Sequence, residues 1–406
     1  MKTERFILLL LAAVNFTHIM DFMIMMPLSN VLIPYFDIST QQFSFLVAAY
    51  SVSAAVSGLT AAFFVDGFDR KKVLIVGYTG FIVGTSLCAV APTYYLLLSS
   101  RIVAGLFGGL IGAQILSIAS DLVPYERRAH AIGVIITAFS ISSAFGVPFG
   151  LKMSDLFSWH APFIIVAAMA IILLPLLIKY VPNMTGHINP KDLNNKPKLF
   201  DVFRAILTDR NQVIALLVTA TLMGQFIIIP FLTSYMVFNV GFTNAQIPYI
   251  YLVGGISTMM LSSPIGRLAD RKGKFKVFTV MALACVVPIA LITNMPRTPF
   301  YFVLVVTGIW FVLSTGRAIA AQAMVTEVVP PKTRGSFMSI NAAVQQLAVG
   351  IYSALAGFIV YNDSANKIYN YSITGVIAIG IIFICFTLAY YLNKAINKKL
   401  KAAANS

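Results

Sequence analysis

The chain has 406 residues, of which 59% are hydrophobic and only 11% are charged. A soluble globular protein carries about 25% charged residues, so this composition excludes an ordinary soluble domain. The formal net charge of +15 does not indicate nucleic-acid binding, because the lysines and arginines lie in short segments between long apolar stretches. We therefore predict an all-α membrane protein that crosses a lipid bilayer many times.

Twelve apolar segments follow one another, and a helix of about 20 apolar residues is enough to cross a bilayer. The first continues to Ile33, which is too long for the apolar part of a cleavable signal peptide. The run from Asn211 to Gly266 contains 56 residues without a charge and accommodates two helices. The approximate spans are 6–35, 43–65, 73–91, 94–121, 130–151, 161–181, 212–238, 246–268, 276–295, 299–327, 336–361 and 370–393.

A polar stretch from Pro182 to Arg210 divides these segments into six and six. We expect an N-terminal six-helix bundle at 1–181 and a C-terminal six-helix bundle at 211–406. The residues between them, 182–210, are expected to form a cytoplasmic linker with an interfacial helix near Phe200 to Leu207.

The distribution of lysine and arginine predicts the orientation. With the N-terminus placed in the cytoplasm, 24 of the 29 lysines and arginines fall in cytoplasmic segments. The opposite loops hold Lys152, Arg297 and Lys367, and the remaining two basic residues, Arg101 and Arg317, lie within apolar segments. Cytoplasmic loops of membrane proteins are enriched in positive charge, so both termini are expected in the cytoplasm, with the chain in the inner membrane of the cell.

The two halves of the chain repeat each other. The charged segment Asp66–Lys72 follows the second apolar segment, and Asp270–Lys276 follows the eighth, 204 residues later. A second match, at an offset of 206, aligns 121–128 with 327–334 and places Glu327 at the position of Asp121. Two matches at nearly one offset predict two pseudo-symmetric six-helix bundles, as in transporters that rock around a central site.

At this point the chain resembles the major facilitator superfamily over essentially its whole length. The run Gly266-Arg-Leu-Ala-Asp-Arg-Lys-Gly-Lys274 is similar to the family's loop motif after helix 8, and 62–72 is a degenerate first copy. In the family this motif latches the cytoplasmic side in the outward-facing state. The resemblance therefore implies a gating role for charged and glycine residues at these loops, while the alternative is that the charges only set topology. The gating candidates are Asp66, Arg70, Asp121, Arg128, Gly266, Asp270, Arg271, Lys274, Glu327 and Arg334.

Two further motifs carry the resemblance. Arg101-x-x-x-Gly105-x-x-x-Gly109 looks like the family's second motif, and its glycines stack on one helix face, where they permit close packing. Gly146-Val-Pro148-Phe-Gly150 resembles the motif associated with antiporters, although a generic Pro/Gly kink is an equal alternative. The run from Asp21 to Leu28 is most similar to the proton-coupled drug and sugar efflux branch.

The deep charged residues are the candidates for proton coupling. Asp21 lies near the middle of the first segment, His18 shares its helix face, and Arg101 is roughly 12 Å inside helix 4. Burial favours a neutral carboxyl and a nearby arginine favours a charged one, so Asp21 could gain and lose a proton if the distance between them changes. The alternative is a static buried pair of Asp21 and Arg101.

Arg317 lies roughly 15 Å inside the tenth segment with no obvious acidic partner. A buried cation without a partner is costly, so we predict that Arg317 faces water or an anionic or hydroxyl-rich substrate, unless it pairs with Asp21. Each neutral residue predicted to line the cavity could equally make a helix-packing hydrogen bond. These residues are Gln114, Gln225, Tyr235, Asn341 and Gln345.

The function predicted from these features is secondary active transport, as proton-coupled efflux of a small organic solute by alternating access. A facilitator or proton-coupled importer of a sugar, nucleoside or organic anion is the alternative, and a membrane-embedded enzyme is a remote one. No nucleotide-binding loop is present, which disfavours ATP drive. The three cysteines, Cys88, Cys285 and Cys385, have no ligand-like spacing. We expect no metal or cofactor, no nucleic acid, and a monomer whose partners are the substrate, protons and the lipid bilayer.

Overall fold

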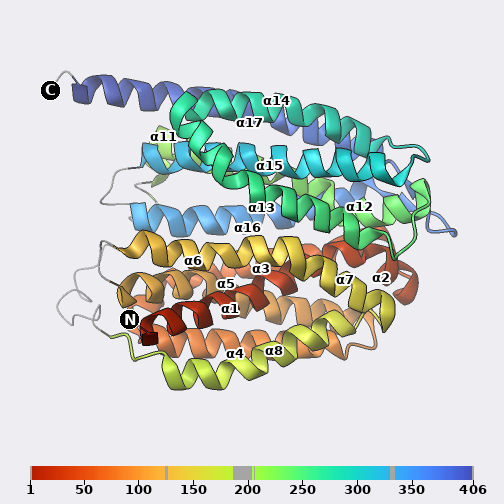
Figure 1. The fold of residues 1–406 in the computed structure, drawn as a ribbon, viewed down its shortest axis with the longest axis horizontal. Helices are drawn as coiled ribbons and strands as arrows, with labels where there is room; N and C mark the ends of the chain where they lie inside the picture. The colour runs from red at the N-terminus through yellow and green to blue at the C-terminus, as the bar shows by residue number, and fades with distance from the viewer. Residues whose placement is uncertain (1, 124–126, 186–203, 205, 330–333, 405–406) are drawn as a thin grey trace.

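The computed structural model of the chain describes residues 2–123, 127–185, 204, 206–329 and 334–404. Almost all of these residues are helical, and the helices form two bundles that lie side by side (Figure 1). Most of the predicted linker, 186–203 and 205, and with it most of the predicted interfacial helix, lies outside the described residues. Helix α8 before it ends at Tyr180, and helix α11 after it begins at Arg210.

Six membrane spans make up the first bundle, and the first and fifth of them are interrupted by short 3₁₀ or π segments. Their elements are α1 (Lys2–Ile24), η1 (Met26–Leu28), α2 (Ser29–Phe36), α3 (Thr40–Phe64), η2 (Val65–Gly67), α4 (Arg70–Ala89), α5 (Tyr94–Leu122), α6 (Arg128–Ile141), η4 (Ser142–Gly146), α7 (Val147–Leu156) and α8 (Ala161–Tyr180).

The second bundle repeats this plan and adds a small hairpin before its last helix. Its elements are α11 (Arg210–Leu222), η5 (Met223–Ile227), α12 (Ile229–Tyr235), η6 (Met236–Val240), α13 (Ile247–Lys272), α14 (Lys274–Thr293), α15 (Phe300–Val328), α16 (Arg334–Ile359), β1 (Tyr361–Asn362), β2 (Ile368–Tyr369) and α17 (Tyr371–Ala404). The two strands pair antiparallel, with Tyr361 opposite Tyr369.

Eleven helices within the described residues are long and apolar enough to cross a membrane by length and composition. The remaining predicted segment, the eighth at 246–268, forms α13, a 26-residue helix that does not reach the same apolarity. Glycines, serines, threonines and tyrosines dilute its apolar residues, while its length still matches a full span. The prediction of an all-α membrane protein with twelve segments in two bundles is therefore confirmed as a fold.

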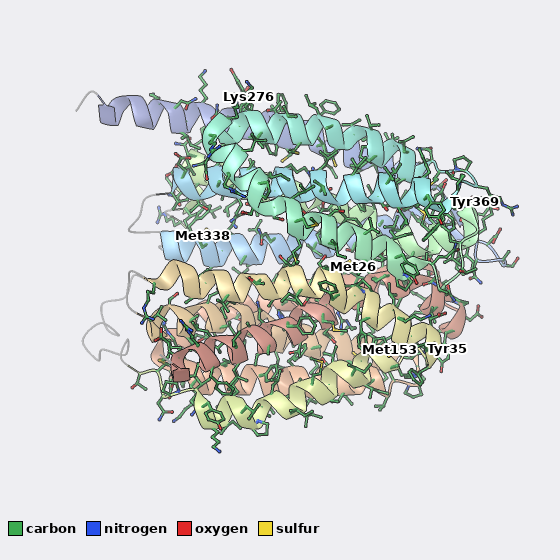
Figure 2. All side chains as sticks on the ribbon, viewed as in Figure 1. Met26, Tyr35, Met153, Lys276, Met338 and Tyr369 are labelled. Carbon is green, nitrogen blue, oxygen red and sulfur yellow. The ribbon has the colours of Figure 1, made fainter. Side chains whose placement is uncertain are left out.

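Both chain termini lie at one end of the molecule, which we call the terminal end (Figure 1). The β1–β2 hairpin lies at the opposite end, which we call the hairpin end. Figure 2 shows Tyr35 and Tyr369 at the hairpin end and Met26 where the two bundles meet. An even number of spans in each half returns the chain to the terminal end, so the two halves present equivalent loops there.

Proline explains where the first and seventh spans break. Pro27 lies in η1 and Pro230 is the second residue of α12, and proline lacks the backbone N–H that would continue the helix. In the fifth span, Pro148 is the second residue of α7, which directly follows the π segment η4. The first and seventh spans thus carry breaks at corresponding places, which extends the internal repeat from sequence to backbone geometry.

The outward surface of the bundles is apolar. Ile172, Val287 and Val376 are each more than 60% exposed although they lie within long apolar helices. Large contiguous apolar surfaces on a protein are covered by another apolar phase. Here the lipid chains of a bilayer provide that cover, because every long helix satisfies its own backbone hydrogen bonds.

Helices α3 and α16 form much of the seam between the bundles. Gly350 of α16 lies so close to α3 that a Cβ atom there would come within 2.7 Å of Val52 and 3.3 Å of the Ala48 carbonyl oxygen. Two helical turns further along α16, Gly357 packs against Ser44 of α3. Small residues therefore let these two helices approach each other in the half of the membrane nearer the hairpin end.

Candidate functional site

The deepest charged contact in the first bundle joins Asp21 of α1 to Arg101 of α5. The Arg101 guanidinium donates to the Asp21 carboxylate at 2.7 Å, and both side chains are 0% exposed. Thr85 of α4 donates a second hydrogen bond to the same carboxylate at 3.2 Å. Three different helices therefore hold one carboxylate in the bundle interior. The sequence predicted the pair, whereas nothing in it singled out Thr85.

Close helix packing fixes the position of Arg101. A Cβ atom at Gly105 would collide with the Tyr50 carbonyl oxygen of α3, and one at Gly109 would collide with that of Ala54. The glycine face of α5 therefore lies directly on α3, as the Gly-x-x-x-Gly spacing suggests. Because Arg101 is one helical turn from Gly105, the α3–α5 contact fixes the depth along the bundle at which the Arg101 side chain lies.

Tyr50 of α3 is a contact of Arg101 that the sequence did not single out. The guanidinium carbon lies 4.4 Å from the centre of the Tyr50 ring, a cation–π geometry. Tyr50 is 0% exposed, and its hydroxyl has no hydrogen-bond partner among the described residues. The only sequence signal for it is a tyrosine in an otherwise apolar stretch, and that signal is common to many membrane helices.

His18 lies beside this cluster without joining it. Its ring packs against Phe81 and Tyr50, with centroid distances of 5.8 Å and 6.4 Å. Neither ring nitrogen has a hydrogen-bond partner within the part of the chain that the structure describes. His18 therefore shares a region with Asp21, as its spacing suggested, but no direct hydrogen bond joins the two side chains.

Arg317 of α15 lies in the second bundle and is 2% exposed. No ion pair joins Arg317 to a carboxylate in the described parts of the chain, and its Nε atom has no acceptor there. Because Asp21 pairs with Arg101, the alternative in which Arg317 holds Asp21 is not the arrangement observed.

The neutral residues predicted for the cavity divide into two groups. Tyr235 donates to the Met295 carbonyl at 3.0 Å, and Asn341 accepts from Thr219 at 2.6 Å, so both are used within the second bundle. Gln114 is buried, with an amide oxygen that lacks a partner among the described residues. Gln225 in η5 and Gln345 in α16 are both partly buried.

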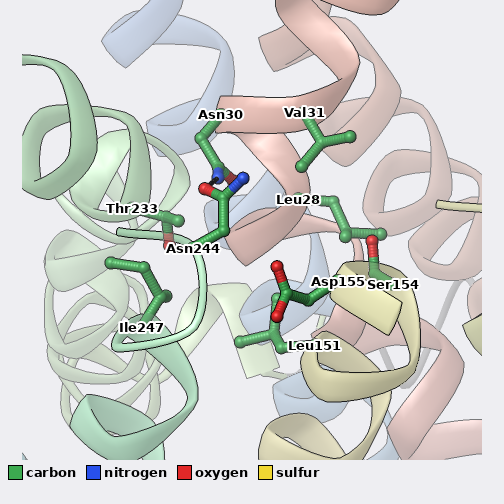
Figure 3. Close-up of a pocket in the computed structure, with 9 residues that line it drawn as sticks. All are labelled: Leu28, Asn30, Val31, Leu151, Ser154, Asp155, Thr233, Asn244 and Ile247. Carbon is green, nitrogen blue, oxygen red and sulfur yellow. Dashed lines mark hydrogen bonds between the residues drawn. The ribbon is translucent and has the colours of Figure 1, made fainter. Parts of the chain in front are cut away.

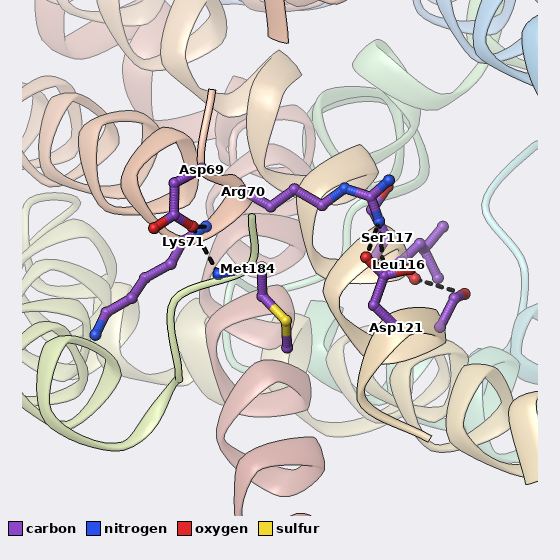
Figure 4. A network of polar contacts seen from close by, with 8 residues as sticks. Asp69, Arg70, Lys71, Leu116, Ser117, Asp121 and Met184 are labelled. Carbon is purple, nitrogen blue, oxygen red and sulfur yellow. Dashed lines mark hydrogen bonds and ion pairs between the residues drawn. The ribbon is translucent and has the colours of Figure 1, made fainter. Parts of the chain in front are cut away.

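Two matched ion pairs lie at the terminal end, one in each bundle. Arg70 at the start of α4 pairs with Asp121 near the end of α5 and also donates to the Ser117 carbonyl (Figure 4). Lys274 at the start of α14 pairs with Glu327 near the end of α15 at 2.7 Å. The sequence offsets of 204 and 206 align these residues, so the repeated motif forms the same bridge twice.

The turns before these ion pairs differ between the halves. Gly273 adopts a φ of +96°, a left-handed conformation that favours glycine. The corresponding Asp69 instead caps α4, since its carboxylate accepts from Lys71 N at 3.0 Å and from Met184 N at 2.9 Å (Figure 4). The departure of Asp69 from the family motif thus has a local structural role, which ties the segment after α8 to the start of α4.

The other gating candidates make fewer contacts. Asp270 and Arg271 are exposed at the end of α13 and form no ion pair among the described side chains, and Gly266 is partly buried. The side chains of Asp66, Arg128 and Arg334 lie outside the described residues.

The antiporter-like motif shapes the packing of the fifth span on the first. Gly150 of α7 lies against Ile24 of α1, where a Cβ atom would come within 2.6 Å of the isoleucine side chain. Gly146 faces Met20 and Phe16 of the same helix. Together with the π segment before Pro148, these glycines place the fifth span against the helix that carries Asp21.

At the hairpin end, polar contacts join the two bundles directly. Ser234 donates to Ser29 at 2.8 Å, and the Asn30 amide donates to Asn244 at 2.7 Å. Thr40 donates to the Val360 carbonyl at 2.5 Å. Ion pairs at the terminal end remain within one bundle in the described parts of the chain, so the bridges between the bundles gather at the hairpin end.

Comparisons with known proteins agree with this architecture. The Major Facilitator Superfamily model matches residues 11–319. The uncharacterized MFS-type transporter YceJ of Bacillus subtilis is 27% identical over 84% of this chain and 85% of its own. A probable sugar efflux transporter of Pasteurella multocida is 21% identical, over 88% of this chain and 84% of its own.

Solved structures show the same fold. A bacterial homolog of the human lysosomal transporter Spinster, in an inward-facing and unoccupied conformation, superposes with a TM-score of 0.76 at 15% identity, over 98% of each chain. A D-xylose–proton symporter gives a TM-score of 0.73 at 16% identity, over 93% of this chain and 96% of the other. The family model covers well over half of the sequence, so the chain belongs to the major facilitator superfamily, a family of membrane transporters and not of enzymes.

Proposed function

We propose that the protein is a proton-coupled exporter of small organic solutes that carry anionic or hydroxyl-rich groups. The observation that supports this most is the fully buried pair of Asp21 and Arg101, in which a carboxylate and a guanidinium meet at 2.7 Å. Ionisable residues inside membrane spans are costly and generally functional. The proposal places Asp21 as the proton carrier, Arg101 as the group that controls its charge, and His18 as an auxiliary proton site.

The coupling mechanism depends on the distance between the two charges. Two unit charges 4 Å apart attract by about 4 kcal/mol at an effective dielectric constant of 20. Moving α1 relative to α5, or drawing Arg101 toward a substrate, removes much of this attraction and favours protonation of Asp21. Return of the guanidinium favours release of the proton. A conformational cycle that alternates these two states carries one proton for each separation of the pair.

Arginine chemistry supports the substrate class. Arg317 has no carboxylate partner among the described residues, and the Nε and Nη2 atoms of Arg101 also lack acceptors there. Two buried guanidinium groups with unused donors favour a ligand that accepts hydrogen bonds and carries negative charge or hydroxyl groups. In this proposal Arg317 contacts the substrate, and Gln114, Gln225 and Gln345 supply further polar contacts from both bundles.

Alternating access supplies the transport path. We propose that the structure represents the state closed at the hairpin end, since the Ser29–Ser234 and Asn30–Asn244 bridges join the bundles there. The terminal end is assigned to the cytoplasm from the lysine and arginine excess, which makes this an inward-facing state in the inner membrane. Asp270, Arg271 and the paired residues of the terminal end would then stabilise the opposite, outward-facing state when the bundles meet there.

The alternative is a facilitator or a proton-coupled importer of a sugar, nucleoside or organic anion. The fold permits either direction, and the D-xylose–proton symporter has the same architecture. Export is favoured by the Gly146–Pro148–Gly150 run and by the probable sugar efflux transporter among the relatives. We assign residues 1–181 and 211–406 to the two rocking bundles and 182–210 to the cytoplasmic connection between them.

Transport by the purified full-length protein in liposomes distinguishes these functions. Vesicles that contain a mixed panel of organic anions, sugars, nucleosides and cationic drugs are given an imposed pH gradient, and solute movement is measured in both directions. The proposal predicts that an inward proton gradient drives uphill movement of an anionic or hydroxyl-rich solute the opposite way. Solute and proton movement in the same direction would favour the importer. Solute movement that does not depend on the pH gradient would favour a facilitator.

A further inference from the structure

A cavity of about 120 Å³ lies between the bundles at the hairpin end (Figure 3). Its walls come from both halves of the chain, with α2 and α7 on one side and α12 and the start of α13 on the other. Neither the Asp21–Arg101 pair nor Arg317 lines it. The cavity is therefore a feature separate from the proposed coupling and substrate residues.

The polar groups around this cavity are mostly oxygen acceptors. Asp155 contributes a carboxylate, Asn30 and Asn244 contribute side-chain carbonyls, and Ser154 and Thr233 contribute hydroxyls. The Thr233 hydroxyl also meets the Tyr251 hydroxyl at 3.1 Å. Asn30 is 7% exposed and donates its amide N–H to Asn244 at 2.7 Å, which leaves its Oδ1 atom buried without a partner in the described chain. The Ser154 hydroxyl also lacks a partner there. Buried acceptors without a donor are costly, so the site calls for a ligand that interacts with oxygen lone pairs.

The charge of the cavity favours a cation over neutral water. No lysine or arginine is among the described residues that line it. Asp155 forms a long ion pair of 3.4 Å with Lys152, whose side chain is 46% exposed and lies outside the cavity lining. Figure 3 shows the Asp155 carboxylate across the cavity from the Asn30 and Asn244 amides. The Asp155 side chain is 25% exposed, which leaves a path from the surrounding solution to the carboxylate.

The number of ligands favours a monovalent ion. Calcium takes six to eight oxygens at ~2.3–2.6 Å and binds more tightly as carboxylates are added. A single carboxylate with a few neutral oxygens balances one positive charge instead. A water molecule takes up about 30 Å³ of liquid volume, so the cavity has room for a small cation with several waters.

We infer that this cavity is a monovalent-cation site, suited to sodium, that clamps the hairpin end in its closed arrangement. Its ligands come from both bundles, so the complete site exists only while the bundles are in contact there. A ligand that binds one state alone multiplies the ratio of that state to the other by one plus the ratio of the ligand concentration to its dissociation constant. Cation binding stands independently of the proposed proton coupling, whereas the clamping effect depends on the proposed opening of the hairpin end.

Cation binding is tested on the purified full-length protein by thermal unfolding in sodium, potassium, calcium or choline chloride at equal ionic strength. We expect the midpoint to rise saturably with sodium but not with choline, and to lose this response in Asp155→Asn. Asp363→Asn is the matched control, because Asp363 lies in the β1–β2 hairpin at the same end but outside the cavity. Equal midpoints in all salts, a response to calcium alone, or an unchanged sodium response in Asp155→Asn would overturn the site.

The clamp is tested by cross-linking the Ser29→Cys, Ser234→Cys double variant, whose native hydroxyls are 2.8 Å apart. At sodium ten times the dissociation constant, the closed-to-open ratio should rise about tenfold, and disulfide formation should become faster accordingly. Asp155→Asn in the same background should abolish the acceleration. A cross-linking rate that does not change with sodium concentration would overturn the clamp. This measurement involves no transport, so that result would not bear on the proton-coupling proposal.

Discussion

Asp21 is held by two donors from two other helices, Arg101 and Thr85, with no exposure to solvent. Removing the charge while keeping the shape isolates its role in coupling. In Asp21→Asn we expect loss of uphill transport driven by a pH gradient, with downhill substrate exchange retained, because the amide still fills the site but cannot carry a proton. The measurement is counterflow and gradient-driven flux in liposomes.

Asp363→Asn, in the exposed hairpin, serves as the control and should retain both activities. If Asp21→Asn still concentrates solute with only a pH difference, the proton is carried elsewhere and the Asp21–Arg101 pair is static. Loss of exchange as well as coupling in a folded Asp21→Asn protein would instead indicate a role in substrate binding.

Arg317 provides the residue-scale test of substrate class. Hydrogen bonds to charged groups contribute about 1.5–3 kcal/mol, so Arg317→Ala should weaken binding of an anionic substrate at least tenfold. Arg317→Lys keeps the charge and should recover part of that loss. Binding is measured by calorimetry and folding by the thermal midpoint, with Arg297→Ala in a loop at the hairpin end as the control. Unchanged binding together with a lowered midpoint in Arg317→Ala would make the residue structural.

At the scale of residues, the sequence predicted which charged residues lie deep in the bundles better than it predicted which side chains they contact. Depth along a helix identified Asp21, Arg101 and Arg317, because charge in an apolar segment is rare. The partners Tyr50 and Thr85 were missed, since which side chains meet across helices depends on helix rotation and crossing, and a single sequence encodes these only through packing of all spans together.

The contact of α5 with α3 is the element-scale feature most sensitive to a small change. Gly105→Ala places a methyl group against the Tyr50 carbonyl oxygen, so the helices must separate. Overpacking of this kind costs about 1–3 kcal/mol, and we expect a lower thermal midpoint and weaker coupling. Gly112→Ala in the same helix is the control, because a Cβ atom there meets nothing within 4 Å. Equal midpoints for the two variants would show that the α3–α5 contact tolerates the added volume.

The bridge between α2 and α12 provides the test of gating. Oxidation of the Ser29→Cys, Ser234→Cys variant should lock the hairpin end and stop transport, and reduction should restore it, because the native hydroxyls already touch across the bundles. Adding Asp270→Asn should accelerate cross-linking if the terminal-end charges stabilise the outward-facing state. Full transport by the oxidised, cross-linked protein would contradict opening of the hairpin end during the cycle.

Sequence patterns located the elements well and their interruptions only partly. The predicted segments correspond to the observed spans, yet the π segment η4 and the 3₁₀ segment η5 follow from how neighbouring helices satisfy freed backbone groups. The α13 helix shows the opposite case, because the uncharged run from Asn211 to Gly266 predicted a span at 246–268 although its apolarity is lower than that of the other spans.

The molecule as a whole repeats one design twice, and the repeat in the sequence was enough to predict it. The offsets that align the charged loops also align the Arg70–Asp121 and Lys274–Glu327 ion pairs. The sequence could not predict which end of the bundles is closed. Conformational state depends on a small free-energy difference between two packings of the same surfaces, whereas the fold depends on the much larger burial of twelve apolar segments.

Orientation in the membrane is the whole-molecule property that the basic residues predict. Lys152, Arg297 and Lys367 all belong to the hairpin end, and 24 other basic residues were predicted for the opposite side. Retention of positive charge in the cytoplasm during insertion therefore predicts that the terminal end is inside. A reporter that is active only in the cytoplasm should be active when fused after Ser406, and a reporter that is active only outside should be inactive there. The same reporters inserted after Ser364, in the β1–β2 hairpin, should report the outside, and the reverse pair of signals would invert the topology and, with it, the proposed direction of transport.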